Sequence, residues 1–129
     1  MENFIRSNPQ LPVKNLQNTL AYYRNELGFY DEWTFGDKDG GIRRDSMMLL
    51  FTEDPEFTNH LNNETHRLPL MWFVNGIDSI LFELKEKEIK IIDELRSHPY
   101  GLREFAFIDI NGYYIRVAER MDPGDNASS

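Results

Sequence analysis

The sequence of 129 residues contains no cysteine. Without thiols the chain can form no disulfide, no thiolate nucleophile and no zinc–thiolate centre. No G-x-S-x-G motif and no glycine-rich phosphate loop occurs, so the sequence signs of a serine hydrolase and of a P-loop site are missing. No apolar run approaches the roughly 18 residues of a membrane-spanning helix. Residues 1–10 lack a basic segment followed by an apolar one, so we expect no signal peptide, no membrane partner and a cytoplasmic location.

The chain has little positive charge: its net charge is −8 and its pI about 4.8. Such a field repels nucleic acid and favours cationic partners. The alternative is that the charge only keeps a cytoplasmic protein in solution. Hydrophobic residues make up 40% and aromatic residues 13%, which is enough to bury a core and excludes global disorder.

Apolar residues at steps of four, three and four predict a helix that begins after Asn15 and ends at Gly28. Asn15 can cap its start, and glycine suits a left-handed exit. Short alternating segments on either side predict strands at residues 9–13, 29–35 and 42–52, the last broken near Asp45. The helix face consists of Leu16, Leu20, Tyr23 and Leu27.

The same order of elements starts again in the second half of the chain. A shift of 61 residues places Val13 on Val74, Leu16 on Ile77, Leu20 on Leu81 and Tyr23 on Leu84. We interpret this as two paired βαβββ modules in one α+β domain, since neither half could bury its sheet alone. The modules cover about residues 8–53 and 68–120, with a linker at 54–67 and a frayed tail at 121–129. Coincidence between two amphipathic helices is the alternative.

The closing stretch GLREFAFIDINGYYIRVAER predicts a hairpin at Asn111-Gly112. This dipeptide is typical of a two-residue loop. A three-residue loop beginning at Ile110 instead places aromatic residues opposite aliphatic ones and makes one pair of opposite charge. We therefore predict the longer loop, with Phe107 opposite Ile115, Phe105 opposite Val117, and Arg103 opposite Glu119.

In this register Arg116 lies on the face away from those apolar side chains, with Glu104 as a diagonal neighbour. An unpaired buried guanidinium is costly, so a carboxylate or a ligand anion should contact it. Glu104 is our candidate. The pair could serve a ligand, or it could be an ordinary structural pair at a dimer seam.

Three segments resemble the vicinal-oxygen-chelate superfamily, which includes glyoxalases, bleomycin resistance proteins and dioxygenases. They are QLPVKNLQNTLAYYRNELGF, VNGIDSILFELKEKEIKI and REFAFIDINGYYIRVAE. The resemblance spans about residues 8–119. It implies paired βαβββ modules in a cup-shaped mixed sheet with helices on the outer face, commonly completed by a dimer partner.

The metal enzymes of this superfamily carry His, Glu or Gln at cup-facing strand positions. By resemblance these positions fall on Asn8, on Met48 or Leu50, on Pro69 and on Arg116. None of these is a good metal ligand, and arginine has no lone pair to give. The chain is therefore most similar to the metal-free, bleomycin-resistance-like subgroup, and we expect no metal and no cofactor.

We accordingly expect a homodimeric protein that binds a cationic or aromatic, antibiotic-like small molecule and is not an enzyme. The alternative is a metal-dependent lyase, isomerase or dioxygenase that uses His60, His66 or Glu104. A third possibility is a cup filled by its own side chains. The expected ligand-binding residues are Trp33, Phe35, Met48, Leu50, Phe73, Glu104, Tyr114 and Arg116.

Strand parity gives further expectations. Alternation places Phe29, Asp31, Trp33 and Phe35 on one face of their strand. By resemblance to the superfamily, Met71 and Phe73 face the cup, so Trp72 should point toward the helix, in the core. His98, which precedes a proline, should face solvent.

Overall fold

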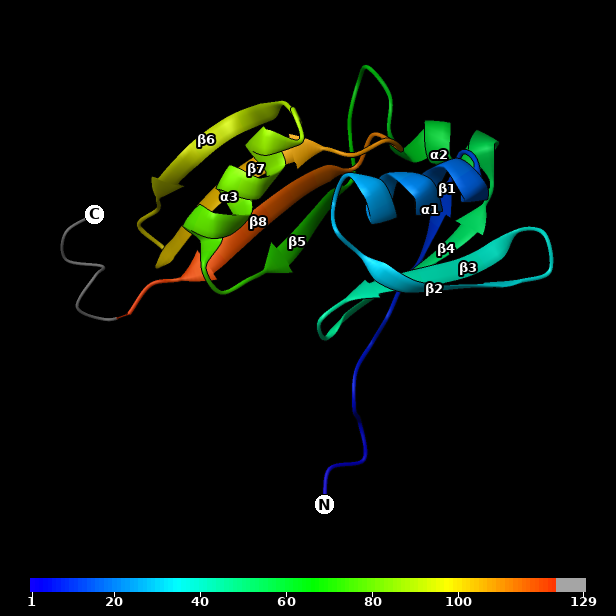
Figure 1. The fold of residues 1–129 in the computed structure, drawn as a ribbon, viewed down its shortest axis with the longest axis horizontal. Coiled ribbons are helices and arrows are strands. Elements are labelled where there is room, and N and C mark those ends of the chain that lie inside the picture. Colours follow the sequence, from blue (N-terminus) through cyan, green and yellow to red (C-terminus); the bar gives the residue numbers. More distant parts are fainter. Residues whose placement is uncertain (123–129) are drawn as a thin grey trace. The chain divides into compact units, whose positions relative to one another are not determined.

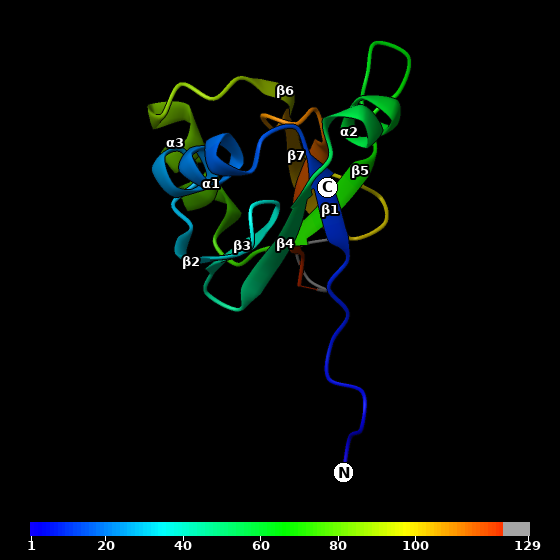
Figure 2. The ribbon, with the colours of Figure 1, turned by 90° about the vertical axis from the view of Figure 1, so that its right-hand side faces the viewer.

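The computed structural model describes residues 1–122, which form two compact units, residues 1–60 and residue 61 onward. Each unit has a four-stranded mixed sheet and a helix packed on one face, so the α+β fold of two βαβββ modules is confirmed (Figures 1 and 2). Part of the predicted tail, residues 123–129, lies outside the described residues. Within residues 1–122 no helix has the length and apolar character needed to cross a bilayer.

The first unit contains a sheet in the order β1-β4-β3-β2. Strand β1 runs parallel to β4, and the other neighbours are antiparallel. Residues 1–9 precede the sheet and run outward from it as an extended segment (Figures 1 and 2). The elements are β1 (Gln10–Val13), α1 (Leu16–Asn25), β2 (Tyr30–Phe35), β3 (Asp39–Arg44) and β4 (Met47–Glu53), followed by α2 (Pro55–Leu61), which reaches the boundary between the units.

The second unit repeats this plan in the order β5-β8-β7-β6. Strand β5 is parallel to β8, and α3 packs on β7 and β8. The sequence predicted these elements except for the extent of β6, which continues beyond the IKII segment. The elements are β5 (Pro69–Phe73), α3 (Ile77–Glu86), β6 (Ile91–Ser97), β7 (Leu102–Ile108) and β8 (Tyr114–Arg120).

The core of each unit lies between its sheet and its helix. The predicted face of α1 is buried, and Tyr23 meets Phe29 edge-on and Phe51 at a tilt. In the second unit Trp72 is buried and contacts Phe107 edge-on, as parity predicted. Removal of apolar side chains such as these from water is the dominant favourable contribution to the free energy of folding.

A glutamate at the end of the last strand of each unit caps the helix of that unit. Glu53 accepts a hydrogen bond from Leu16 N at 2.8 Å. Glu119 accepts from Gly76 N at 2.8 Å and from Ile77 N at 3.1 Å. A carboxylate at a helix N-terminus satisfies backbone N–H groups that have no intrahelical partner. The two modules therefore share this capping device as well as their topology.

Candidate functional site

The hairpin of β7 and β8 has the predicted three-residue loop. Asp109 N donates to Tyr113 O at 3.1 Å, and Gly112 has a φ of 85°, which glycine adopts without strain. The ladder places Phe107 opposite Ile115, Phe105 opposite Val117 and Arg103 opposite Glu119, so the predicted register is confirmed.

This register brings Arg116 onto Glu104. Arg116 Nε lies 2.9 Å from Glu104 Oε1, and Nη2 lies 3.1 Å from Oε2. The Glu104 side chain is 7% exposed and that of Arg116 34%. These hydrogen bonds raise the pKa of Arg116, so the guanidinium stays charged. The predicted carboxylate partner is therefore present, on the sheet face opposite the α3 side.

Tyr100 also belongs to this cluster, and sequence reasoning missed it. Its hydroxyl lies 3.3 Å from Arg116 Nη2. Loss of water around the hydroxyl and the nearby Glu104 carboxylate raise the pKa of Tyr100. Tyr100 sits in the tight turn between β6 and β7, where Gly101 N donates to His98 O at 3.0 Å. An aromatic residue at a Pro-x-Gly loop tip was the available sequence signal.

The expectation for His98 is wrong. Its ring stacks on that of Tyr100 with centroids 4.8 Å apart, which half-buries the side chain. Its Nε2 is buried and has no hydrogen-bond partner among residues 1–122. The turn folds the two rings together, and sequence spacing alone does not reveal this contact.

The other expected binding residues of the second unit lie on the same face as Arg116. Phe73 pairs with Ala118 on β8, and its side chain is 55% exposed. Tyr114 is half-buried and pairs with Pro69 on β5. The open face of this sheet therefore carries two aromatic rings, those of Phe73 and Tyr114, together with a charged pair.

In the first unit Trp33 lies directly over Gly41. A β-carbon at residue 41 would be 2.7 Å from three atoms of the indole ring. A β-carbon at Gly40 would lie 2.8 Å from the backbone oxygen of Trp33 and 3.2 Å from a methyl carbon of Leu16, on the side of α1. Trp33 and Gly41 are thus on the sheet face opposite the helix, together with Leu50, which pairs with Gly41.

Phe35 and Met48 complete the expected set on this face of the first unit. Phe35 is 77% exposed and Trp33 42%, whereas Met48 and Leu50 are half-buried. The structure therefore places all four on one open face of the sheet and none in the core beneath α1.

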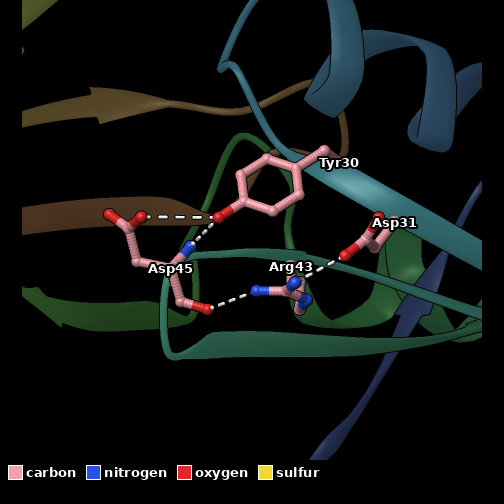
Figure 3. A network of polar contacts seen from close by, with 4 residues as sticks. All are labelled: Tyr30, Asp31, Arg43 and Asp45. Carbon is pink, nitrogen blue, oxygen red and sulfur yellow. Dashed lines mark hydrogen bonds and ion pairs between the residues drawn. The ribbon is translucent and has the colours of Figure 1, made fainter.

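The prediction that Phe29 shares a face with Trp33 is wrong, because β2 contains a bulge. Tyr30 pairs with Arg43 but Trp33 pairs with Gly41, which leaves one extra residue on β2. Asp31 has a φ of 54°, and Arg43 Nη2 holds its carboxylate at 2.5 Å (Figure 3). Phe29 consequently turns into the core while Trp33 turns away from it.

Figure 3 shows how this bulge is held. Arg43 Nη1 donates to Asp45 O at 2.9 Å, and its guanidinium carbon lies 4.8 Å from the centre of the Tyr30 ring. Asp45 N donates to the Tyr30 hydroxyl at 2.8 Å. One arginine therefore joins the two left-handed residues, Asp31 and Asp45, and sets the direction of Trp33.

The family pattern of the Glyoxalase/Bleomycin resistance protein/Dioxygenase superfamily matches residues 7–117. The chain belongs to this superfamily. No curated protein sequence matches the chain.

Solved structures support the superfamily fold. The chain is similar to a bleomycin resistance determinant encoded on the transposon Tn5, with a TM-score of 0.76 and 18% identity over 91% of this chain and 98% of that one. A superfamily protein from Nocardioides gives a TM-score of 0.73 at 11% identity, over 96% and 88%. A lactoylglutathione lyase from Agrobacterium tumefaciens gives 0.70 at 15% identity, over 92% and 96%.

The superfamily positions named above can now be located within each unit. Asn8 Nδ2 donates to Met48 O at 3.0 Å, so this amide is already engaged. Gln10 pairs with Leu50, and Met71 pairs with Arg116. Because the shift of 61 residues places Gln10 on Met71, the counterpart of Arg116 is Leu50.

The donor chemistry of these positions remains poor for a metal ion. They offer the Asn8 amide, which already donates a hydrogen bond to Met48 O, together with apolar side chains and a guanidinium. Across residues 1–122 no three His, Cys, Asp or Glu side chains gather in a way that could hold a metal ion.

Proposed function

We propose that this superfamily member is a small-molecule binding protein that takes an aromatic or cationic, antibiotic-like ligand without a metal ion of its own. One observation carries the proposal: Arg116, at a position where metal enzymes of the superfamily carry a ligand, is bonded to Glu104. A guanidinium has no lone pair to give and cannot coordinate a metal ion, while Glu104 neutralises its charge.

The exposed aromatic side chains support the same proposal. Trp33 and Phe35 lie on the open face of one sheet and Phe73 on that of the other. Flat aromatic surfaces bind planar ligands, and they attract cations over the ring. The net charge of −8 favours a cationic ligand in solution. By resemblance, we infer that the protein is a cytoplasmic homodimer that protects by sequestration.

A calorimetric titration with a bleomycin-type glycopeptide, in the presence of a chelator, tests the proposal. We expect saturable binding to the wild type. We also expect Phe35→Leu and Trp33→Leu to weaken it about tenfold, since each removes a ring contact. Phe82→Leu is the matched control, because Phe82 is 67% exposed on α3, which packs on the other face of its sheet.

Two results would overturn this assignment. One is the absence of heat at about 500 µM ligand, well above the micromolar affinity that sequestration requires. The other is stoichiometric zinc, nickel, manganese or iron in protein purified without chelator, which would favour the metal-dependent lyase, isomerase or dioxygenase.

A further inference from the structure

A hollow of about 280 Å³ lies in the second unit at the end of β5 and β8. Its lining consists of Phe73, Val74, Asn75 and Arg120. The two strands are parallel neighbours, so their C-terminal ends meet at one edge of the sheet. The hollow combines one aromatic ring, one amide and one guanidinium.

Arg120 is exposed, and within residues 1–122 no side chain or carbonyl accepts a hydrogen bond from it. The other two arginines of this hairpin are neutralised. Arg116 is bonded to Glu104, and Arg103 donates to both oxygens of Asp78, at 3.0 and 3.2 Å. Among the arginines of β7 and β8, Arg120 is thus the one without a carboxylate partner within residues 1–122.

The carboxylate next to Arg120 in sequence is committed elsewhere. Both oxygens of Glu119 accept backbone hydrogen bonds at the start of α3. Because successive side chains of a strand point to opposite faces, Glu119 points to the helix and Arg120 to the open face. The guanidinium of Arg120 is therefore available to an anion from outside the described chain.

We propose that this hollow binds a small aromatic carboxylate. The planar fork of Arg120 matches a carboxylate, and the exposed Phe73 ring offers a surface for the aromatic part of the ligand. The Asn75 amide adds a hydrogen-bond donor. A volume of about 280 Å³ is just below the usual range for ligand pockets and suits a single ring.

This site goes beyond the ligand binding proposed above. It uses Arg120 and Asn75, which that proposal does not, and it shares only Phe73. It also differs in charge, because an anion is expected here and a cation or a neutral aromatic ligand there. Arg116 takes no part, since Glu104 already occupies it.

Benzoate is the probe. We titrate ¹⁵N-labelled full chain and follow the Asn75 side-chain amide, the Arg120 Nε–H and the backbone amides of residues 73–76 by NMR. We expect saturable chemical-shift changes that are confined to these groups. The dissociation constant should be millimolar or lower. Benzamide, which keeps the ring and loses the charge, should bind at least about tenfold more weakly.

Arg120→Gln should weaken benzoate at least about tenfold, because it removes the charge and keeps a polar side chain of similar length. Phe73→Leu should weaken benzoate binding. It should leave the affinity for acetate unchanged, because acetate has a carboxylate but no ring. Arg96→Gln is the control, since Arg96 is an exposed strand arginine elsewhere on the sheet, 3.9 Å from Asp93. Equal benzoate affinity in Arg120→Gln and wild type, or no saturation at about 20 mM, overturns the proposal.

The outcome is separable from that of the glycopeptide experiment. Failure of glycopeptide binding concerns the open face that carries Trp33 and Phe35, and it does not change the expected result of the benzoate titration. Failure of benzoate at Arg120 leaves glycopeptide binding as it is.

Discussion

The indole of Trp33 lies over Gly41, so close that a β-carbon on residue 41 would be 2.7 Å from its ring. Only glycine fits at residue 41, because the indole occupies the space that a side chain would need. We predict that Gly41→Ala lifts the indole off the sheet and lowers the free energy of unfolding by about 1–3 kcal/mol. Tryptophan fluorescence and urea denaturation measure the two effects.

A double-mutant cycle tests whether the indole causes the loss of stability in Gly41→Ala. In a Trp33→Ala background the new methyl group meets no ring, so Gly41→Ala should cost less than about 0.5 kcal/mol. An equal cost in both backgrounds would mean that strand geometry, and not the indole, requires glycine at residue 41.

The Glu104–Arg116 pair yields a second prediction. Glu104→Gln leaves the half-exposed guanidinium without a charged partner, and we expect a loss of about 1–2 kcal/mol, between the values for exposed and fully buried pairs. Lys85→Gln breaks an exposed pair, in which Lys85 Nζ lies 3.5 Å from Glu94, and should cost under about 0.5 kcal/mol. Chemical denaturation of both variants makes the comparison, and equal losses would contradict it.

The two capping glutamates should differ in their contributions. Glu119 accepts two backbone hydrogen bonds at a helix whose N-cap, Gly76, has no side chain. Glu53 accepts one, and Asn15 also caps that helix, through a 2.8 Å bond from Asn18 N. We therefore expect Glu119→Ala to cost about 1–2 kcal/mol and Glu53→Ala about 0.5–1 kcal/mol.

Denaturant midpoints of these two variants measure the difference. Glu86→Ala, at the last residue of α3, provides the control and should not destabilise the protein. The reverse order of the two losses would show that the caps are not independent of the rest of each unit.

Tyr113 should make stability depend on alkaline pH. Burial, and to a lesser degree the charge of Asp109, raises the pKa of Tyr113 well above its usual value. The folded protein keeps the phenol neutral, whereas the unfolded chain loses the proton near pH 10. Stability from this group is thus present below about pH 10 and falls above it by up to about 1.4 kcal/mol per pH unit.

Tyr113→Phe removes the titrating group. Its free energy of unfolding should fall less steeply than that of the wild type between about pH 10 and pH 11.5, as measured by urea denaturation. The difference between the two proteins at pH 7 serves as the reference. Parallel curves across the alkaline range would refute the assignment.

Patterns between near neighbours in sequence made much of the fold predictable. The spacing of Leu16, Leu20 and Tyr23, with Asn15 before them, predicted α1 and its buried face. The hairpin register followed from matching Phe105 and Phe107 to aliphatic partners, and the Glu104–Arg116 contact followed from that register. Such features depend on interactions along one helix or across one hairpin, whose geometry is standard.

The direction of Trp33 was not predictable in this way. Parity along β2 gave the wrong set of neighbours, because Arg43, from another strand, holds Asp31 in a left-handed conformation and shifts the register. A bulge moves every later side chain of the strand to the opposite face. Sequence alternation cannot reveal it without the partner strand.

The sequence by itself determined the duplicated α+β plan, the superfamily resemblance and the pairing of Glu104 with Arg116. Only the tertiary structure decided that Tyr100 touches that pair, that Glu119 caps α3 and that no carboxylate of residues 1–122 contacts Arg120. The physical reason is the distance in sequence between the residues that interact. Periodicity reports which face a side chain takes, whereas its contacts with residues distant in sequence depend on which strands and turns the fold brings together.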